Sequence, residues 1–267
     1  LHWGWQAAFI IAGVLGFLWL ALWIPFYEVP ERCRRVKAAE LALIRSDPKD
    51  MGGDGKVLWR SLFKYRQTWS FIAGKFLTDP VWWFFLIWLP DYFKKTRGLD
   101  IKNSWVHLVT IYVIVTVLSI LGGWVTGYLT KTGWSVTRAR KVGMVIFALL
   151  VIPIIWVTKL GDWQAVLIIG LAGSAHQAWS ANLYTTVSDM FPKKAVASVI
   201  GLGGMAGSLG GMCFPIFSGR LLDKFTASGN VTAGYAILFA VCGCAYLVAF
   251  AIHHALAPKF EPFAMEE

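Results

Sequence analysis

Residues 74–90 read GKFLTDPVWWFFLIWLP, a stretch that is almost wholly apolar and yet contains Lys75, Asp79 and Pro80. These are the residue types that a membrane-spanning helix tolerates least. Their presence inside an apolar block raises two linked questions: whether the chain crosses a bilayer, and what polar groups do there.

The composition answers the first question. Hydrophobic residues make up 57% of the 267 residues, charged residues only 15%, and there are fifteen Trp. The mean hydropathy is +0.58. An ordinary soluble protein has roughly a quarter charged residues, so the composition predicts an all-α, polytopic membrane protein.

Seven apolar blocks have the length of a transmembrane helix, near the ~20 residues that cross a ~30 Å hydrocarbon core. The first lacks the short basic leader of a signal peptide, so none is expected to be cleaved. Because the chain starts at Leu1, we expect further spans upstream. The predicted spans are 3–27, 69–93, 104–129, 140–158, 164–187, 195–218 and 231–256.

The basic residues between the blocks predict the orientation, since Lys- and Arg-rich loops stay on the cytoplasmic side. If 28–68 is cytoplasmic, that side holds 17 Lys and Arg, against seven on the other side. The net charge of +10 therefore reflects topology. A nucleic-acid partner is not expected, because no basic soluble domain is present.

The segment 28–68 marks a boundary between the first block and the other six. Within it, SDPKDMGGDGK at 46–56 is typical of an exposed linker. The preceding stretch places Val36, Leu41 and Ile44 near one side of a helix, with basic residues around the rest. This pattern fits either a helix lying on the membrane surface or a solvated helix.

Lys75 and Asp79 are spaced to form an ion pair on one helix face, with Asp79 near the middle of the bilayer. Pro80 frees the carbonyl of Phe76, so we expect the helix to be loosened there. A charge at that depth usually faces the bundle interior or an aqueous cavity. The pair either contacts solute or only fixes the helix against its neighbours. Trp82 and Trp83 offer flat walls for the C–H faces of a sugar.

A second polar segment, SAHQAWSANLYTT at 174–186, lies deep in a predicted span. Its donors and acceptors suit a hydroxyl-rich ligand better than a packing seam, although internal hydrogen bonds would satisfy some of them. His176 is either a hydrogen-bonding residue or a proton-coupling group. The predicted ligand contacts here are His176, Gln177, Trp179, Ser180 and Asn182.

Two further patterns have packing as their main alternative. The hydroxyl-bearing stripe from Tyr112 to Thr126 either borders a cavity or joins helices. In GLGGMAGSLGG at 201–211, glycines recur every four residues, which favours close helix packing over ligand contact. The four cysteines predict neither a disulfide nor a metal site, because Cys242 and Cys244 point in different directions on a helix. No cofactor and no catalytic residue are expected.

Three stretches together resemble the hexuronate transporters of the anion:cation symporter branch of the major facilitator superfamily. They are GKFLTDPVWWFFLIWLPDYF at 74–93, GWSVTRARK at 133–141 and AHQAWSANLYTTVSDMFPKKAVASVIGLGGMAGSLGG at 175–211. The likeness covers nearly the whole chain. The segment 123–141 departs from it, since it lacks the Asp-Arg pair often found in the corresponding superfamily loop.

The resemblance implies a fold of two six-helix halves that rock around a central site. The chain would then contain the last helix of the N-terminal half (1–27), the central cytoplasmic loop (28–68), the six-helix C-terminal half (69–256) and a cytoplasmic tail (257–267). The missing N-terminal half would be a partner, and in related symporters it holds most of the carboxylate-binding and proton-carrying residues.

The resemblance further implies proton-coupled uptake of hexuronates such as galacturonate and glucuronate across a bacterial inner membrane. Two alternatives are a symporter of another organic anion, such as an aldonate, and a sensor that binds sugar acid without moving it. An intramembrane enzyme using His176 and Asp79 is disfavoured, because the chain has no Ser–His signature, paired catalytic aspartates or HExxH motif. A channel is also disfavoured, because the sequence contains no filter-like loop.

Overall fold

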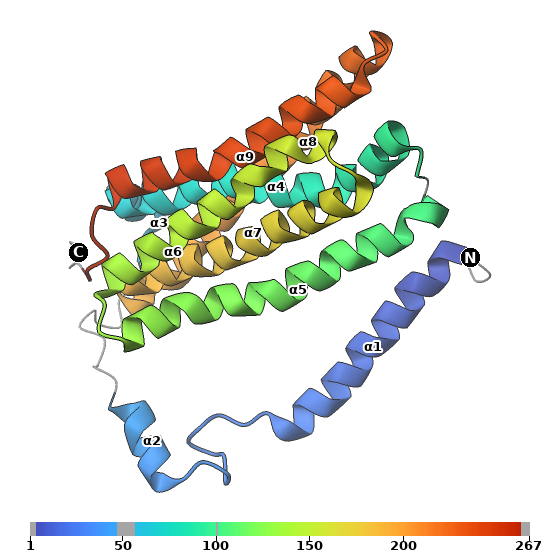
Figure 1. Cartoon of the computed structure of the whole chain (residues 1–267). Coiled ribbons are helices and arrows are strands. Elements are labelled where there is room, and N and C mark those ends of the chain that lie inside the picture. The colour runs from blue at the N-terminus through green and yellow to red at the C-terminus, as the bar shows by residue number, and fades with distance from the viewer. Residues whose placement is uncertain (1–3, 47–56, 100, 263–267) are drawn as a thin grey trace. The chain divides into compact units, whose positions relative to one another are not determined.

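A computed structural model describes residues 4–46, 57–99 and 101–262. The regular elements in these ranges are all helices, as the sequence predicts (Figure 1). The chain divides into two units, residues 1–50 and 51–267. The division falls inside 28–68, the segment predicted to be a loop. Part of that segment is helical.

The first unit contains α1 (Gly4–Phe26) and the short α2 (Ala38–Arg45). α1 is apolar on all sides, and Gln6–Phe26 contains no buried residue. Such a helix requires lipid or other helices around it. α2 forms within the stretch predicted to be amphipathic, and it leaves Leu43 and Ile44 exposed. Both interpretations of α2 therefore stay open.

The second unit is a bundle of long helices. After the single turn α3 (Trp59–Leu62), the chain forms α4 (Arg66–Arg97), α5 (Ile101–Lys131) and α6 (Val136–Val151). A 3₁₀ segment, η1 (Ile152–Lys159), extends α6. The bundle is completed by α7 (Asp162–Met190), α8 (Lys193–Ala227) and α9 (Val231–Leu256). α4 packs mainly on α8 and α9, while α5 and α6 pack on α7 (Figure 1).

Six helices in the described part of the chain are long and apolar enough to cross a membrane. They correspond to six of the seven predicted spans. The remaining predicted span, 164–187, corresponds to α7. This helix is long enough to cross a membrane, but its hydropathy is lower because its C-terminal half carries the polar segment. α7 lies in the interior of the bundle, and more than half of its residues are buried.

The prediction that Pro80 loosens its helix is not supported, because α4 runs as one α-helix through both Pro80 and Pro90. The freed Phe76 carbonyl lies against α8 at Gly210, where an added Cβ would be 2.5 Å from the oxygen. Close packing on a glycine surface therefore holds the two segments of α4 in line.

Candidate functional site

The centre of the candidate site is the ion pair predicted on α4. Nζ of Lys75 lies 2.7 Å from Oδ2 of Asp79, and the two side chains are 5% and 19% exposed. The Lys75 ammonium also sits 4.5 Å from the centroid of the Tyr184 ring on α7, a cation–π geometry. The pair is thus enclosed on one side by an aromatic face and retains partial access on the other.

α8 closes the pair from another direction. A Cβ added to Gly207 would lie 2.9 Å from Cγ of Asp79, so only glycine allows α8 to come this close. Gly203 and Gly211 make similar close approaches to Phe71 and Trp83 of α4. The prediction that this glycine repeat serves helix packing is confirmed, and one of its members also confines the Asp79 carboxylate.

An aromatic wall adjoins the ion pair one turn further along α4. The Trp82 ring stacks on His176 of α7, with centroids 5.4 Å apart and planes 7° apart, and its edge meets Tyr112 of α5. Nδ1 of His176 shares a hydrogen bond of 2.6 Å with the Tyr246 hydroxyl of α9. His176, held by Tyr246, therefore packs against the Trp82 ring and fixes its orientation.

Gln177 and Ser180 lie on the α7 face that borders this site. They share that face with Gly173 and Tyr184, because residues at i, i+4, i+7 and i+11 align along a helix. Gly173 is next to Trp82 and Tyr184 is next to Lys75. Gln177 and Ser180 fall between these two contacts on the same face and are half-buried. Direct contacts join Lys75 to Asp79 and Trp82 to His176, and helix geometry places Gln177 and Ser180 next to them.

The other three predicted residues lie apart from this group. Asn182 is rotated about 140° around α7 from Gln177, is buried, and donates from Nδ2 to the carbonyl of Ala178. Trp179 is fully buried against Tyr246. Trp83 is partly exposed beside Gly211 of α8. The contacts described for these three side chains are with other parts of the bundle, so their role in binding stays a prediction.

Three tyrosines complete the site and were not among the predicted contacts. Tyr112 and Tyr184 belong to polar patterns that are visible in the sequence, but their rotation toward α4 is not. Tyr246 lies in an apolar stretch that carries no signal. Its role follows only from its hydrogen bond with His176.

An apolar pocket of about 470 Å³ lies elsewhere, between α4, α8 and α9. Its lining includes Phe76, Phe214 and Phe217 together with the thiols of Cys213 and Cys244. These side chains offer no partner for a charged or hydroxyl-rich ligand, so this pocket does not compete with the polar site as the candidate for a sugar acid.

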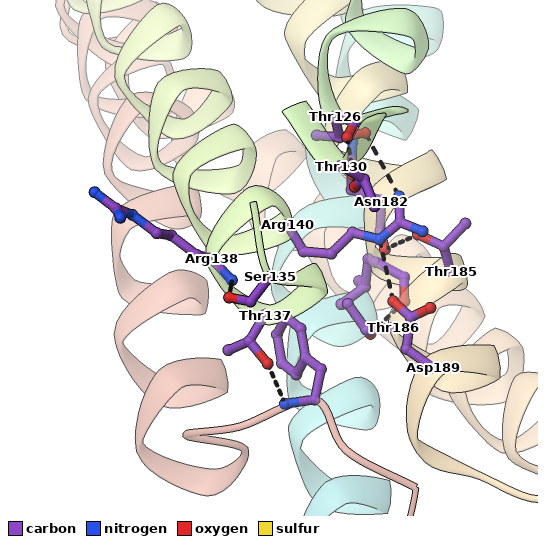
Figure 2. Close-up of polar contacts among 12 residues, drawn as sticks. Thr126, Thr130, Ser135, Thr137, Arg138, Arg140, Asn182, Thr185, Thr186 and Asp189 are labelled. Atoms are coloured by element: carbon purple, nitrogen blue, oxygen red, sulfur yellow. Dashed lines mark hydrogen bonds and ion pairs between the residues drawn. The ribbon is translucent and has the colours of Figure 1, made fainter. Parts of the chain in front are cut away.

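Asn182 belongs instead to a polar cluster at the end of the bundle where α5, α6 and α7 meet (Figure 2). Here Nε of Arg140 donates to Oδ2 of Asp189 at 3.1 Å, and its Nη1 lies 3.5 Å from Oγ1 of Thr126. Both charged side chains are 20% exposed. The cluster ties α6 to α7 in the region where the sequence departs from the superfamily loop pattern.

Asp189→Ala is expected to lower the free energy of unfolding by about 1.5–3 kcal/mol, the usual value of a hydrogen bond to a charged group. The reason is that Arg140 loses its ionic partner in a half-buried position. Thermal unfolding in detergent measures the change. Asp223→Ala, which removes an exposed acid of α8, is the matched control. Equal stability of the two variants would contradict the conclusion that Arg140 and Asp189 hold α6 and α7 together.

Comparison with known proteins identifies the family. The model of the Major Facilitator Superfamily matches residues 1–215. The chain belongs to the major facilitator superfamily. It is therefore a multi-pass membrane protein of a transport family, and α4 to α9 form a six-helix unit of a major facilitator protein.

Several of its relatives are named as transporters of sugar acids. The chain is 29% identical to the hexuronate transporter of Escherichia coli K12 over 242 residues, which are 89% of the chain and 54% of the relative. It is 25% identical to a D-galactonate transporter of E. coli O6:H1 over 236 residues, covering 84% and 54%. It is 28% identical to a probable galactarate/D-glucarate transporter of E. coli K12 over 257 residues, covering 90% and 57%. The chain thus spans about half the length of these relatives.

Proposed function

We propose that the chain is the C-terminal portion of a proton-coupled symporter that takes up hexuronates such as galacturonate and glucuronate across a bacterial inner membrane. The observation that carries the proposal is the buried Lys75–Asp79 pair on α4, beside the Tyr184 ring and on the side of α7 that bears Gln177 and Ser180. The sugar-acid transporters among its relatives support the same substrate class.

Each part of the site matches a part of the proposed substrate. The Lys75 ammonium offers a charge-assisted hydrogen bond to the uronate carboxylate. The faces of Trp82 and Tyr184 are suited to the C–H surfaces of a pyranose ring. Gln177 and Ser180 supply donors and acceptors for its hydroxyls. In alternating access, α4 to α9 would move as one body about the N-terminal half, with the sugar near the midplane.

Gln177→Ala and Ser180→Ala are each expected to raise the half-saturating sugar concentration for uptake roughly 2- to 13-fold. A lost hydrogen bond is worth about 0.5–1.5 kcal/mol. Uptake of labelled galacturonate by cells carrying the full-length transporter measures this. Ser188→Ala, an exposed serine two turns along α7 from Ser180, is the control at matched membrane abundance. Unchanged uptake kinetics in both site variants would remove them from the site.

The second candidate substrate is an aldonate, and the similarity to a D-galactonate transporter favours it. Competition between uronates and aldonates for uptake by the full-length protein separates the two substrates. If galactonate inhibits uptake more strongly than galacturonate does, the substrate would be assigned as an aldonate and not as a hexuronate. Binding without any flux in reconstituted vesicles would instead indicate a sensor.

A further inference from the structure

The Lys75–Asp79 pair has a property beyond binding, because a substrate carboxylate competes with one of its members. Asp79 and a sugar acid present the same chemical group, and each pairs best at short range with the Lys75 ammonium. That ammonium is already covered on one side by the Tyr184 ring. With its side chain only 5% exposed, Lys75 has little room for two carboxylates at ideal distance.

Among the residues that the structure describes, the groups that face Asp79 provide no second cation. Lys75 is its partner on α4, α7 contributes Tyr184 and His176 near that lysine, and α9 contributes the Tyr246 hydroxyl. α5 reaches the region through Tyr112, which meets Trp82. α8 presents Gly207, which has no side chain to donate or titrate. When the substrate takes Lys75, Asp79 is therefore left without a compensating charge among these groups.

The charge balance then favours protonation of Asp79. Lys75 with Asp79 is neutral, and a bound monoanionic sugar acid would make the site net negative in a poorly hydrated region. An uncompensated charge there is costly, and one proton on Asp79 restores neutrality. The proton comes from the aqueous side that is open when the substrate enters. After the substrate has departed, the proton leaves to the opposite side, and the ionised Asp79 carboxylate pairs with Lys75 again.

We propose that Asp79 is a proton-carrying residue of the transporter, taking up one proton as the substrate carboxylate displaces it from Lys75. This inference rests on the proposed function. It places a coupling group in the C-terminal half, whereas the sequence resemblance implies that most such groups belong to the N-terminal half. One proton would travel with each monovalent sugar acid at this site.

The test uses the full-length transporter in proteoliposomes with labelled galacturonate. Asp79→Asn keeps the shape of the side chain but binds no proton at neutral pH. We expect this variant to retain exchange of labelled for unlabelled substrate, while accumulation driven by a pH gradient falls to simple equilibration. Substrate-induced proton uptake, followed with a pH-sensitive dye, should be lost. Asp91→Asn, at the far end of the same helix, is the matched control and should keep both activities.

Each outcome separates the two proposals. If Asp79→Asn still concentrates galacturonate and takes up protons as the wild type does, the inference is overturned and the proposed function stands. If the wild type exchanges no sugar acid, the proposed function is overturned, and with it the inference that rests on it. Should the variant not fold, the wild type decides: electroneutral galacturonate uptake, insensitive to an imposed membrane potential, supports one proton per monoanion. Uptake that carries net charge overturns that stoichiometry.

Discussion

Lys75→Met is expected to destabilise the bundle by about 3 kcal/mol and to abolish sugar-acid uptake, whereas Lys75→Met combined with Asp79→Leu should recover most of the stability and none of the uptake. Breaking a buried pair leaves one charge uncompensated, at a cost of about 3–5 kcal/mol. The lower end applies here because Asp79 is 19% exposed. Replacing both members by apolar residues of similar size is often neutral.

The double-variant experiment separates the two interpretations of the pair that the sequence leaves open. If Lys75 and Asp79 only fix α4 against its neighbours, the double variant restores uptake along with stability. If the pair binds solute, stability returns and uptake does not. Unfolding in detergent and labelled galacturonate uptake, both measured on the full-length transporter, give the two readouts. A Lys75→Met variant with normal uptake would exclude the lysine from the site.

Gly210→Ala is expected to destabilise the packing of α4 on α8 by about 1–3 kcal/mol, the usual cost of overfilling a packed interface. The added methyl would lie 2.5 Å from the Phe76 carbonyl oxygen and 2.8 Å from Cγ of Pro80. The first of these contacts is with backbone and the second with a rigid ring. Neither can move aside as the end of a flexible side chain would, so the helices must separate.

Gly204→Ala is the matched control for this prediction. It lies on the same helix, and an added Cβ there meets nothing within 4 Å. Alanine favours helix over glycine by about 0.5–1 kcal/mol, so this variant should be neutral or slightly stabilising. Thermal unfolding in detergent compares the two variants. Equal stability of both would mean that α4 and α8 are not in close contact at Gly210.

The helices of this protein were largely predictable because apolar blocks of membrane length stand out against charged connections. The boundaries shifted by a few residues, most at α8, which continues to Ala227 beyond its predicted end at 218. The effect of Pro80 was mispredicted for a physical reason. A proline loosens an isolated helix, but here α8 packs its glycine face directly against the freed carbonyl.

The site was predictable only where a single helix determines it. The Lys75–Asp79 contact follows from i, i+4 spacing, and one polar segment marks the inner half of α7. Contacts between helices depend on how each helix is rotated, which one sequence does not show. That is why Tyr246 went unrecognised. Asn182 was grouped with Gln177 by composition, although helical geometry places them about 140° apart.

The low hydropathy of α7 also bears on how the protein is made. A helix carrying His176, Gln177, Ser180 and Asn182 partitions into lipid less readily than its neighbours, since each amide or imidazole opposes insertion. During synthesis α7 would depend on α5 and α6, which precede it in the chain and contact it in the bundle. The polar residues of α7 would thereby make its insertion into the bilayer sensitive to changes in α5 and α6.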